Sequence, residues 1–467
     1  MTRFNTSDNL KMLTRKTDSQ FNLGTVTFVQ LQILRFIGGG FMLSTKGTQF
    51  FQNGKPFFYL ADTCWSAFTN ITLEEWQYYL DYREQQGFTA IQMNILSQWD
   101  ASGSDLDILP YPITQSGAHY QYDFSKPNHE YFDRAEQMVA AVQAHHMVPV
   151  LVLLWSNYVP GTWSANMNIN NQMPFDEIKP YVSAVTERFK KFSPIYFVSG
   201  DTDFPTEETV NYYREALKVA KVHDAGALYA CHIKGRLAEV PAELLNQLDF
   251  FCYQSGHNLA GQNTAYTIPS ALRAQGYQKP IINAEPCYEQ ISYSRNLYGR
   301  YDARDVRQAS WSSVLSGADA GITYGAHGIW SWHRLNHSFG IVQGEGFDAP
   351  FDWRDALHFD GANDIAYLKT IMEQYFPNGA TAVQTKLHCE ESIRISVNEN
   401  RDRYAIYLPT NTILDLNPLK ITSTNASAYV IDLNKRQQYP LKFTDSTHLA
   451  MSRSEADSVI IVDIKGA

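Results

Sequence analysis

The feature that most constrains this chain is a strand-then-helix pattern that repeats eight times between about residues 56 and 375. Each repeat contains a short apolar run followed by a loop and a segment with helical periodicity. Strands that are apolar along their whole length are typical of parallel sheets covered by helices. Eight units in series predict an α/β protein with a (β/α)8 barrel, also called a TIM barrel.

An open, doubly wound parallel sheet is the alternative architecture. No glycine-rich phosphate loop follows the first apolar run, which argues against a nucleotide-binding version of that fold. The eight predicted strands occupy residues 56–65, 88–96, 147–155, 194–201, 227–233, 249–257, 280–285 and 320–330.

Local signals support several of these boundaries. Asn53-Gly54 predicts a hairpin turn that leads into the first strand. Thr72 and Glu75 form a capping-box pattern at the start of a helix, and Gly87 is a candidate for its C-cap. Residues 97–127 form a long polar loop, a type of segment that often carries function.

The pattern changes near residue 378. From there to residue 467, short alternating or β-branched runs follow one another with no helical segment between them. This predicts an antiparallel β-sandwich as an accessory domain, after a catalytic barrel at residues 44–377. No low-complexity linker separates the two, so we expect them to pack directly.

Residues 1–43 differ from the rest of the chain. Lys11, Arg15 and Lys16 precede a moderately apolar stretch that two glutamines and an arginine interrupt, so it is too polar for a membrane span. We predict a signal-like or disordered extension ahead of the folded protein. Such an extension favours export to the periplasm or cell surface.

Composition narrows the function classes. A formal net charge of -10 and a pI near 5.7 argue against a nucleic-acid surface, which needs clustered Lys and Arg. An aromatic content of 13% suits carbohydrate binding, because aromatic faces stack on the C–H surfaces of sugars. The five cysteines show no metal-ligand spacing, so we predict mostly buried free thiols, no metal and no cofactor.

Two carboxylates stand at the ends of predicted strands. Glu285 follows the apolar run Pro280-Ile281-Ile282, and Asp201 follows the run that begins at residue 194. In a (β/α)8 barrel the C-terminal ends of the strands carry the active site. A pair of carboxyl groups is what cleavage of a glycosidic bond requires. Asp201 could instead cap the next helix, but Thr206 is better placed for that role.

Other candidates for substrate binding share a position at or just after a predicted strand end. They are Asp62, Trp65, Asn94, Gln98, Trp99, Trp155, Asp203, Tyr253, His257, Glu289, Tyr324, His327 and Trp330. Asn157, His232 and Gln254 hold similar positions.

Structural roles compete for several of these residues. Asp203 is equally suited to capping a helix, and the tryptophans are equally suited to the core. A metal site built from His232, His257 and His327 lacks any ligand-type spacing. A serine nucleophile lacks the GxSxG elbow.

Four segments in order resemble the apiosidase-like glycoside hydrolases, family 140. They are YLADTCWSAF, the GD of YFVSGDTD, EPCYE, and YGAHGIWSW. The resemblance covers about residues 45–375, and the segment after it resembles the collagen-binding-type β-domain that commonly follows this barrel. It implies a (β/α)8 exo-glycosidase in which Asp201 is the acid/base and Glu285 the nucleophile. Related barrel glycosidases carry Asn-Glu where this chain has Gly-Asp.

The sequence therefore predicts a glycoside hydrolase that removes a terminal sugar, such as apiose or another furanose of a pectic side chain, by a retaining mechanism. Glu285, ionised, attacks the anomeric carbon, and Asp201, kept protonated by partial burial and by the charge of Glu285, protonates the leaving oxygen. The predicted partner is an oligosaccharide or polysaccharide. The alternative is a non-catalytic glycan- or matrix-binding protein on an inactive barrel.

Overall fold

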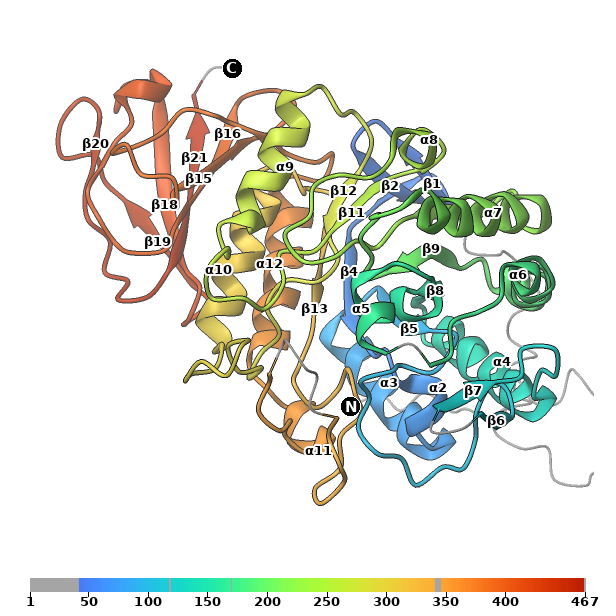
Figure 1. Cartoon of the computed structure of the whole chain (residues 1–467). Coiled ribbons are helices and arrows are strands. Elements are labelled where there is room, and N and C mark those ends of the chain that lie inside the picture. Colours follow the sequence, from blue (N-terminus) through green and yellow to red (C-terminus); the bar gives the residue numbers. More distant parts are fainter. Residues whose placement is uncertain (1–41, 117–118, 169, 341–345, 466–467) are drawn as a thin grey trace, which may run out of the picture. The chain divides into compact units, whose positions relative to one another are not determined.

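The computed structural model describes residues 42–116, 119–168, 170–340 and 346–465. Eight parallel strands form one sheet in the order β10-β9-β8-β5-β4-β13-β12-β11 (Figure 1). A parallel bridge between His232 and Cys252 joins the two ends of this order, as expected for the predicted barrel. The strands are β4 (Tyr59–Thr63), β5 (Ala90–Asn94), β8 (Val148–Trp155), β9 (Ile195–Gly200), β10 (Leu228–Ala230), β11 (Phe251–Tyr253), β12 (Ile281–Asn283) and β13 (Gly321–Tyr324).

Helices follow the barrel strands and cover the outside of the sheet. The capping box predicted for the first long helix is present: Thr72 accepts from the backbone N–H of Glu75, whose side chain accepts from the N–H of Thr72. Gly87 ends that helix in the left-handed conformation. The helices are α2 (Ala67–Asn70), α3 (Leu73–Gln86), α4 (His129–Ala144), α5 (Trp163–Met167), α6 (Phe175–Phe189), α7 (Glu207–His223), α8 (Ala242–Leu245), α9 (Thr264–Ala274), α10 (Ala303–Val314), α11 (Trp353–Ala356) and α12 (Gly361–Tyr375).

Two small antiparallel sheets add to the barrel. β1 (Leu43–Lys46), β2 (Gln49–Gln52) and β3 (Lys55–Phe57) precede β4, and the β2–β3 hairpin turns at Asn53-Gly54 as predicted. Phe50 of β2 is fully buried against Phe250 and Tyr59, at the N-terminal side of the barrel strands. The predicted long loop contains the hairpin of β6 (Ile113–Ser116) and β7 (His119–Tyr122).

The C-terminal region is antiparallel, as predicted. Its main sheet has the order β14-β15-β16-β21-β18-β19, and β17 pairs with β20 in a separate two-stranded sheet. The strands are β14 (Thr381–Ala382), β15 (Arg394–Val397), β16 (Arg403–Leu408), β17 (Leu414–Asp415), β18 (Ala426–Asp432), β19 (Gln437–Leu441), β20 (His448–Leu449) and β21 (Ser458–Ile464).

The central strands β16 and β21 of this six-stranded sheet are buried on both faces. Tyr407 and Ile461 belong to the same apolar core as the barrel. The alternate side chains Ile406 and Ile460 pack in a second core with the β17–β20 sheet. Because successive side chains point to opposite faces, burial on both sides explains why β21 is nearly all apolar.

A buried ion-pair cluster joins α10, α12 and the segment before β21. The guanidinium of Arg307 contacts Asp457 through Nη2 at 2.7 Å and Asp364 through Nη1 at 2.7 Å. Asp364 also contacts Arg436 at 2.9 Å. Residues 40–467 form one compact unit, so the domain boundary at residue 378 remains a sequence prediction.

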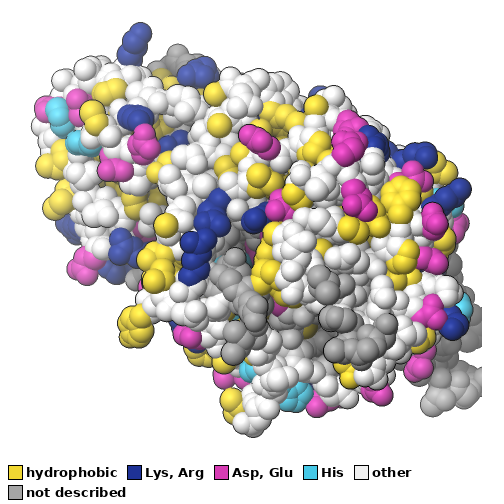
Figure 2. All heavy atoms as spheres, viewed as in Figure 1, with side chains coloured by type: hydrophobic (Ala, Val, Ile, Leu, Met, Phe, Trp, Pro, Cys, Tyr) yellow, Lys and Arg dark blue, Asp and Glu magenta, His cyan; other side chains and the backbone are white. Residues whose placement is uncertain are grey.

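The predicted extension at residues 1–43 lies almost entirely outside the described residues. In the part of the chain that is described, no helix combines the length and hydropathy needed to cross a membrane. On the face shown in Figure 2, acidic and basic side chains are interspersed.

Candidate active site

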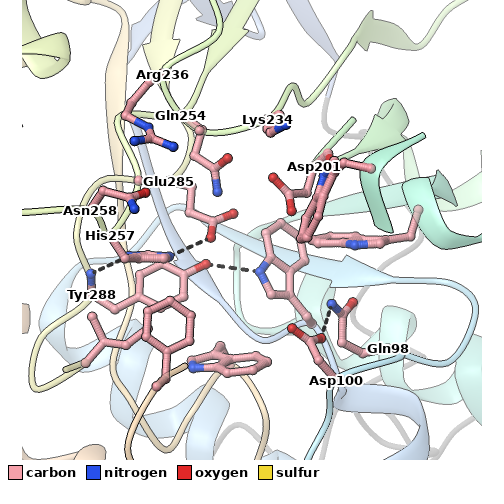
Figure 3. A pocket seen from close by; sticks show the side chains of 18 residues that line it. Gln98, Asp100, Asp201, Lys234, Arg236, Gln254, His257, Asn258, Glu285 and Tyr288 are labelled. Atoms are coloured by element: carbon pink, nitrogen blue, oxygen red, sulfur yellow. Dashed lines mark hydrogen bonds and ion pairs between the residues drawn. The ribbon is translucent and has the colours of Figure 1, made fainter. Parts of the chain in front are cut away.

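A cavity lies at the C-terminal ends of the barrel strands (Figure 3). Every barrel strand or the segment after it contributes to its wall, because parallel strands all end at the same rim. The lining side chains are Trp65, Gln98, Asp100, Trp155, Trp163, Asp201, Lys234, Gly235, Arg236, Gln254, Gly256, His257, Asn258, Glu285, Tyr288, Ile291, Trp330 and Phe347.

Glu285 is buried just after β12 and has a histidine beside each carboxylate oxygen. Nε2 of His257 lies 2.9 Å from Oε1, and Nε2 of His232 lies 3.2 Å from Oε2. The side chain of Glu285 points into the cavity (Figure 3). The carboxylate thus has two N–H groups available to balance its charge.

Backbone contacts assign the tautomer of both histidines. The N–H of Asp201 donates to Nδ1 of His232 at 3.0 Å, and the N–H of Tyr288 donates to Nδ1 of His257 at 3.4 Å. A ring nitrogen that accepts a hydrogen bond carries no proton, so in each neutral ring the proton is on Nε2. Both rings therefore direct an N–H at Glu285.

This environment favours the ionised form of Glu285. Burial raises the pKa of the carboxyl group, but the contacts with His232 and His257 outweigh burial and lower the pKa to about 2. Tyr288 lies alongside, where its hydroxyl accepts a hydrogen bond from Nε1 of Trp65 at 3.0 Å. Burial and the charge of Glu285 raise the pKa of Tyr288 well above its ordinary value, so the phenol keeps its proton.

Asp201 approaches the cavity from the end of β9. Its backbone is left-handed, with a φ of 47°, an uncommon conformation for a residue other than glycine. Two hydrogen bonds hold this conformation. The backbone N–H of Asp201 donates to His232, and Nε1 of Trp163 donates to the carbonyl oxygen of Asp201 at 2.7 Å. Its carboxyl group points into the cavity toward Glu285 (Figure 3).

Gly200 is required at the preceding position. A Cβ there would come within 2.3 Å of the ring of Trp155, which lines the cavity. Because Gly200 has no side chain, β9 can pass directly behind Trp155 in the wall of the cavity.

The walls of the cavity are aromatic. Trp65 and Trp155 meet edge to face with centroids 5.0 Å apart, and Trp163, Trp330 and Phe347 complete the apolar surface. Such faces suit the C–H surface of a sugar ring, and the polar side chains between them suit its hydroxyls.

The polar lining includes residues from the loop after β5 and the segment after β10. Nε2 of Gln98 donates to Asp100 at 2.7 Å. Lys234 forms an ion pair with Asp203 at 3.5 Å and lies over the ring of Trp163. Arg236 and Lys234 bring positive charge to one side of the cavity.

Eight of the candidates that the sequence places at strand ends meet in this cavity. They are Trp65, Gln98, Trp155, Asp201, Gln254, His257, Glu285 and Trp330.

Four more predicted residues lie behind the described wall and hold it in place. Asn94 donates to Gln98 at 3.1 Å. Asp203 accepts from the backbone N–H of Trp163 at 3.0 Å. Trp99 meets the ring of Trp163 edge to face, with centroids 6.0 Å apart.

His327 is the fourth of these supporting residues. Burial lowers the pKa of His327 to about 3, so its ring is neutral. Nδ1 accepts from Nε1 of Trp330 at 3.1 Å, and Nε2 lies 2.8 Å from the carbonyl oxygen of Asp348. The ring thereby orients a tryptophan of the wall.

Four other predicted residues face the helix layer instead of the cavity: Asp62, Tyr253, Glu289 and Tyr324. Asp62 is buried against α3, where Nε of Arg83 lies 2.5 Å away and the hydroxyl of Tyr79 donates to it at 2.8 Å. Tyr324 is the register partner of Asp62 and also faces outward, donating to Glu289 at 2.6 Å. Side chains alternate along a strand, so a shift of one position moves a residue from the lumen to the helices.

Tyr253 and Glu289 complete this outward-facing group. The hydroxyl of Tyr253 donates to the carbonyl of Ala265 on α9 at 2.7 Å. Glu289 accepts from the backbone N–H of Gly361, the first residue of α12, at 2.9 Å. Neither side chain belongs to the described lining of the cavity.

Several lining residues were not among the predicted site residues. Lys234, Arg236 and Asn258 come within a few positions of the ends of β10 and β11, so extending the strand-end rule would have included them. Tyr288 stands inside the EPCYE segment. Phe347 comes from a loop with no strand signal nearby.

The described residues contain no cluster of three or more His, Cys, Asp or Glu side chains arranged to hold a metal ion. All five cysteines are free; Cys64, Cys231, Cys252 and Cys287 are buried and Cys389 is exposed.

Comparisons with known proteins place these observations in a family. A family model described as "Apiosidase-like, catalytic domain" matches residues 45–377. A solved structure titled "Glycoside hydrolase" superposes with a TM-score of 0.74 at 21% identity, covering 91% of this chain and 97% of that one. A glycoside hydrolase family 5 structure from Bacteroides vulgatus has the same TM-score and identity, with 90% and 93% coverage. At these identities the two structures show a shared fold. Among curated proteins, none matches.

Proposed function

Because this chain belongs to the apiosidase-like family and is a glycosidase, we propose that it removes a terminal sugar with Glu285 as nucleophile and Asp201 as acid/base. One observation carries the proposal. Glu285 and Asp201 come from different strands, line one cavity and point toward each other across it (Figure 3).

The environment of Glu285 suits the role of nucleophile. Its pKa of about 2 keeps the carboxylate ionised at neutral pH. In the first step a carboxylate oxygen of Glu285 forms a bond to the anomeric carbon as the glycosidic C–O bond breaks. The proton of Asp201 passes to the departing oxygen, so a neutral alcohol leaves.

Asp201 then reverses its role. As a carboxylate, it takes a proton from a water molecule whose oxygen attacks the anomeric carbon. The ester bond to Glu285 breaks, and Glu285 regains its charge. The two displacements together retain the anomeric configuration, which requires the carboxyl groups to be about 5 to 5.5 Å apart.

The proposed substrate is a terminal apiose or another furanose on a pectic side chain. Family membership and the aromatic walls support a carbohydrate in the cavity. Hydrolysis of such a polymer takes place where the polymer is, which fits the export predicted from the sequence.

The test uses Glu285→Gln and Asp201→Asn with pectic side-chain oligosaccharides, and released monosaccharides are measured by chromatography. Each variant should lose about two to four orders of magnitude in kcat, because each replaces a reacting carboxyl group with an amide of similar shape that does not react. Glu239→Gln and Asp107→Asn make the same chemical change at exposed barrel positions and should keep the parental rate. Parental activity in either catalytic-site variant would refute the assignment.

The stereochemical outcome is a separate measurement. Proton NMR of the first-formed sugar should show the anomer of the substrate. The opposite anomer would mean inversion and would remove the covalent step from the mechanism.

A further inference from the structure

One buried side chain links the backbone of Asp201 to the carboxylate of Glu285. His232 follows β10 and has no exposed surface. Its Nδ1 accepts the backbone N–H of Asp201 at 3.0 Å, and its Nε2 lies 3.2 Å from Oε2 of Glu285. A single imidazole ring therefore spans the gap between the end of β9 and the end of β12.

Aromatic neighbours limit the movement of this ring. Its centroid lies 5.5 Å from that of Trp65, 6.0 Å from that of Trp155 and 5.7 Å from that of Phe197. A ring packed on several sides cannot turn without displacing the wall of the cavity. The spacing that His232 imposes is therefore rigid.

Nε2 of His232 and Oε2 of Glu285 are paired with each other. Neither Nε2 of His232 nor Oε2 of Glu285 has a regular hydrogen bond within the described residues, and each is the ion-pair neighbour of the other. The two atoms are 3.2 Å apart, but their alignment is not that of a regular hydrogen bond. In free enzymes, catalytic hydrogen bonds are often long or poorly aligned and tighten when substrate binds.

We propose that His232 is a positioning residue with two separable functions. Nδ1 holds the backbone of Asp201 in its left-handed conformation, and Nε2–H steadies the carboxylate of Glu285. Together they fix the separation between the acid/base and the nucleophile. This inference rests on the proposed function, because it assigns a purpose to the distance between those two carboxyl groups.

Two substitutions of His232 separate its two functions. His232→Asn places an amide near the position of Nδ1, so its oxygen can still accept the N–H of Asp201, but nothing reaches Glu285. His232→Gln places an amide near the position of Nε2, so its NH2 group can still donate to Glu285, but the N–H of Asp201 loses its acceptor. Thermal unfolding first establishes that both variants are folded.

The kinetic probes are phenyl and 2,4-dinitrophenyl apiofuranosides. Dinitrophenolate leaves without protonation, whereas phenoxide needs the acid. His232→Gln should lose about tenfold or more in kcat/KM on the phenyl glycoside and much less on the dinitrophenyl glycoside. His232→Asn should lose similar factors on both, because attack by Glu285 is common to them. Equal losses for both variants on both substrates would overturn the proposal.

A substrate-independent measurement keeps this inference separate from the proposed function. With ¹⁵N-labelled histidine, long-range ¹H–¹⁵N NMR of the parental protein should show His232 as the Nε2–H tautomer at neutral pH, assigned by the signals that vanish in His232→Asn. An Nδ1–H tautomer or a doubly protonated ring would overturn the proposal. Retained activity in Glu285→Gln would instead refute the proposed function and leave the tautomer result to stand on its own.

Discussion

Glu285 combines burial with an ionised side chain, a combination that is costly unless the charge is compensated. His232 and His257 supply that compensation from two neighbouring strands, one at each carboxylate oxygen. Backbone N–H groups occupy both Nδ1 atoms, so each ring directs its Nε2–H at the carboxylate. The nucleophile of the proposed mechanism is therefore held between two N–H donors.

A pH profile tests this account at His257. His257→Phe removes the closer donor, and without it the burial of Glu285 should raise the pKa of that carboxyl group. Since Glu285 acts as a carboxylate, the acid limb of kcat/KM should move to higher pH by about one unit or more. His129→Phe, at an exposed histidine on α4, should leave the limb in place. A limb unchanged in His257→Phe would contradict the role of the histidines.

The start of α12 depends on a side chain from another element. Asp360 precedes the helix but makes no capping bond, and the carboxylate of Glu289 accepts the N–H of Gly361 instead. Gly361 has no room for a side chain, since a Cβ would lie 2.4 Å from Oε2 of Glu289. The loop that carries Glu285 and Tyr288 is thereby tied to α12.

Glu289 also makes stability depend on pH. Burial raises the pKa of Glu289 to about 7, although bonds from Tyr324 and Gly361 oppose the shift. A carboxyl group whose folded pKa exceeds its unfolded value stabilises the folded state below the unfolded pKa of about 4.5, and this stabilisation is lost as pH rises through about 7.

Glu289→Gln tests this dependence, because the amide does not titrate. The free energy of unfolding of the parental protein, relative to that of the variant, should fall by up to about 3 kcal/mol between pH 4.5 and pH 8. Urea unfolding at several pH values measures the difference. Parallel profiles for the two proteins would contradict the prediction, because they would mean that folding leaves the pKa of Glu289 unchanged.

The barrel and the C-terminal sheet share one apolar core, and charged side chains join them as well. Arg307 on α10 contacts Asp457, which precedes β21, and Asp364 on α12, and all three side chains are buried. In Figure 1 the C-terminal strands lie beside α10 and α12. The sheet is thus part of the support for helices that cover the catalytic barrel.

Arg307→Met should lower the free energy of unfolding by about 3–5 kcal/mol, because it leaves the buried carboxylate of Asp457 without its cation and leaves Asp364 with Arg436 alone. Denaturant unfolding measures the loss, with Arg453→Met as the matched change at an exposed arginine.

Removal of residues 378–467 should yield an insoluble barrel, since it exposes the apolar face that Tyr407 and Ile461 now cover. A soluble and active barrel after that removal would show that the sheet is a dispensable module.

The eight-unit barrel, the antiparallel C-terminal region and the strand-end carboxylates Asp201 and Glu285 are all readable from local patterns. Apolar runs, helical periodicity and turn residues are properties of neighbouring positions in the chain, so a single sequence contains them. The contribution of Trp65, Trp155 and Trp330 to the cavity follows from the same strand-end rule.

The direction of each side chain and its distant partner are not local properties. Asp62 and Tyr324 stand at strand ends like Asp201, yet the alternation of the strand turns them toward α3 and Glu289. The tautomer of His232 depends on the N–H of a residue 31 positions earlier in the chain. Such pairings arise only when the barrel closes, because closure is what brings the ends of separate strands within hydrogen-bond distance.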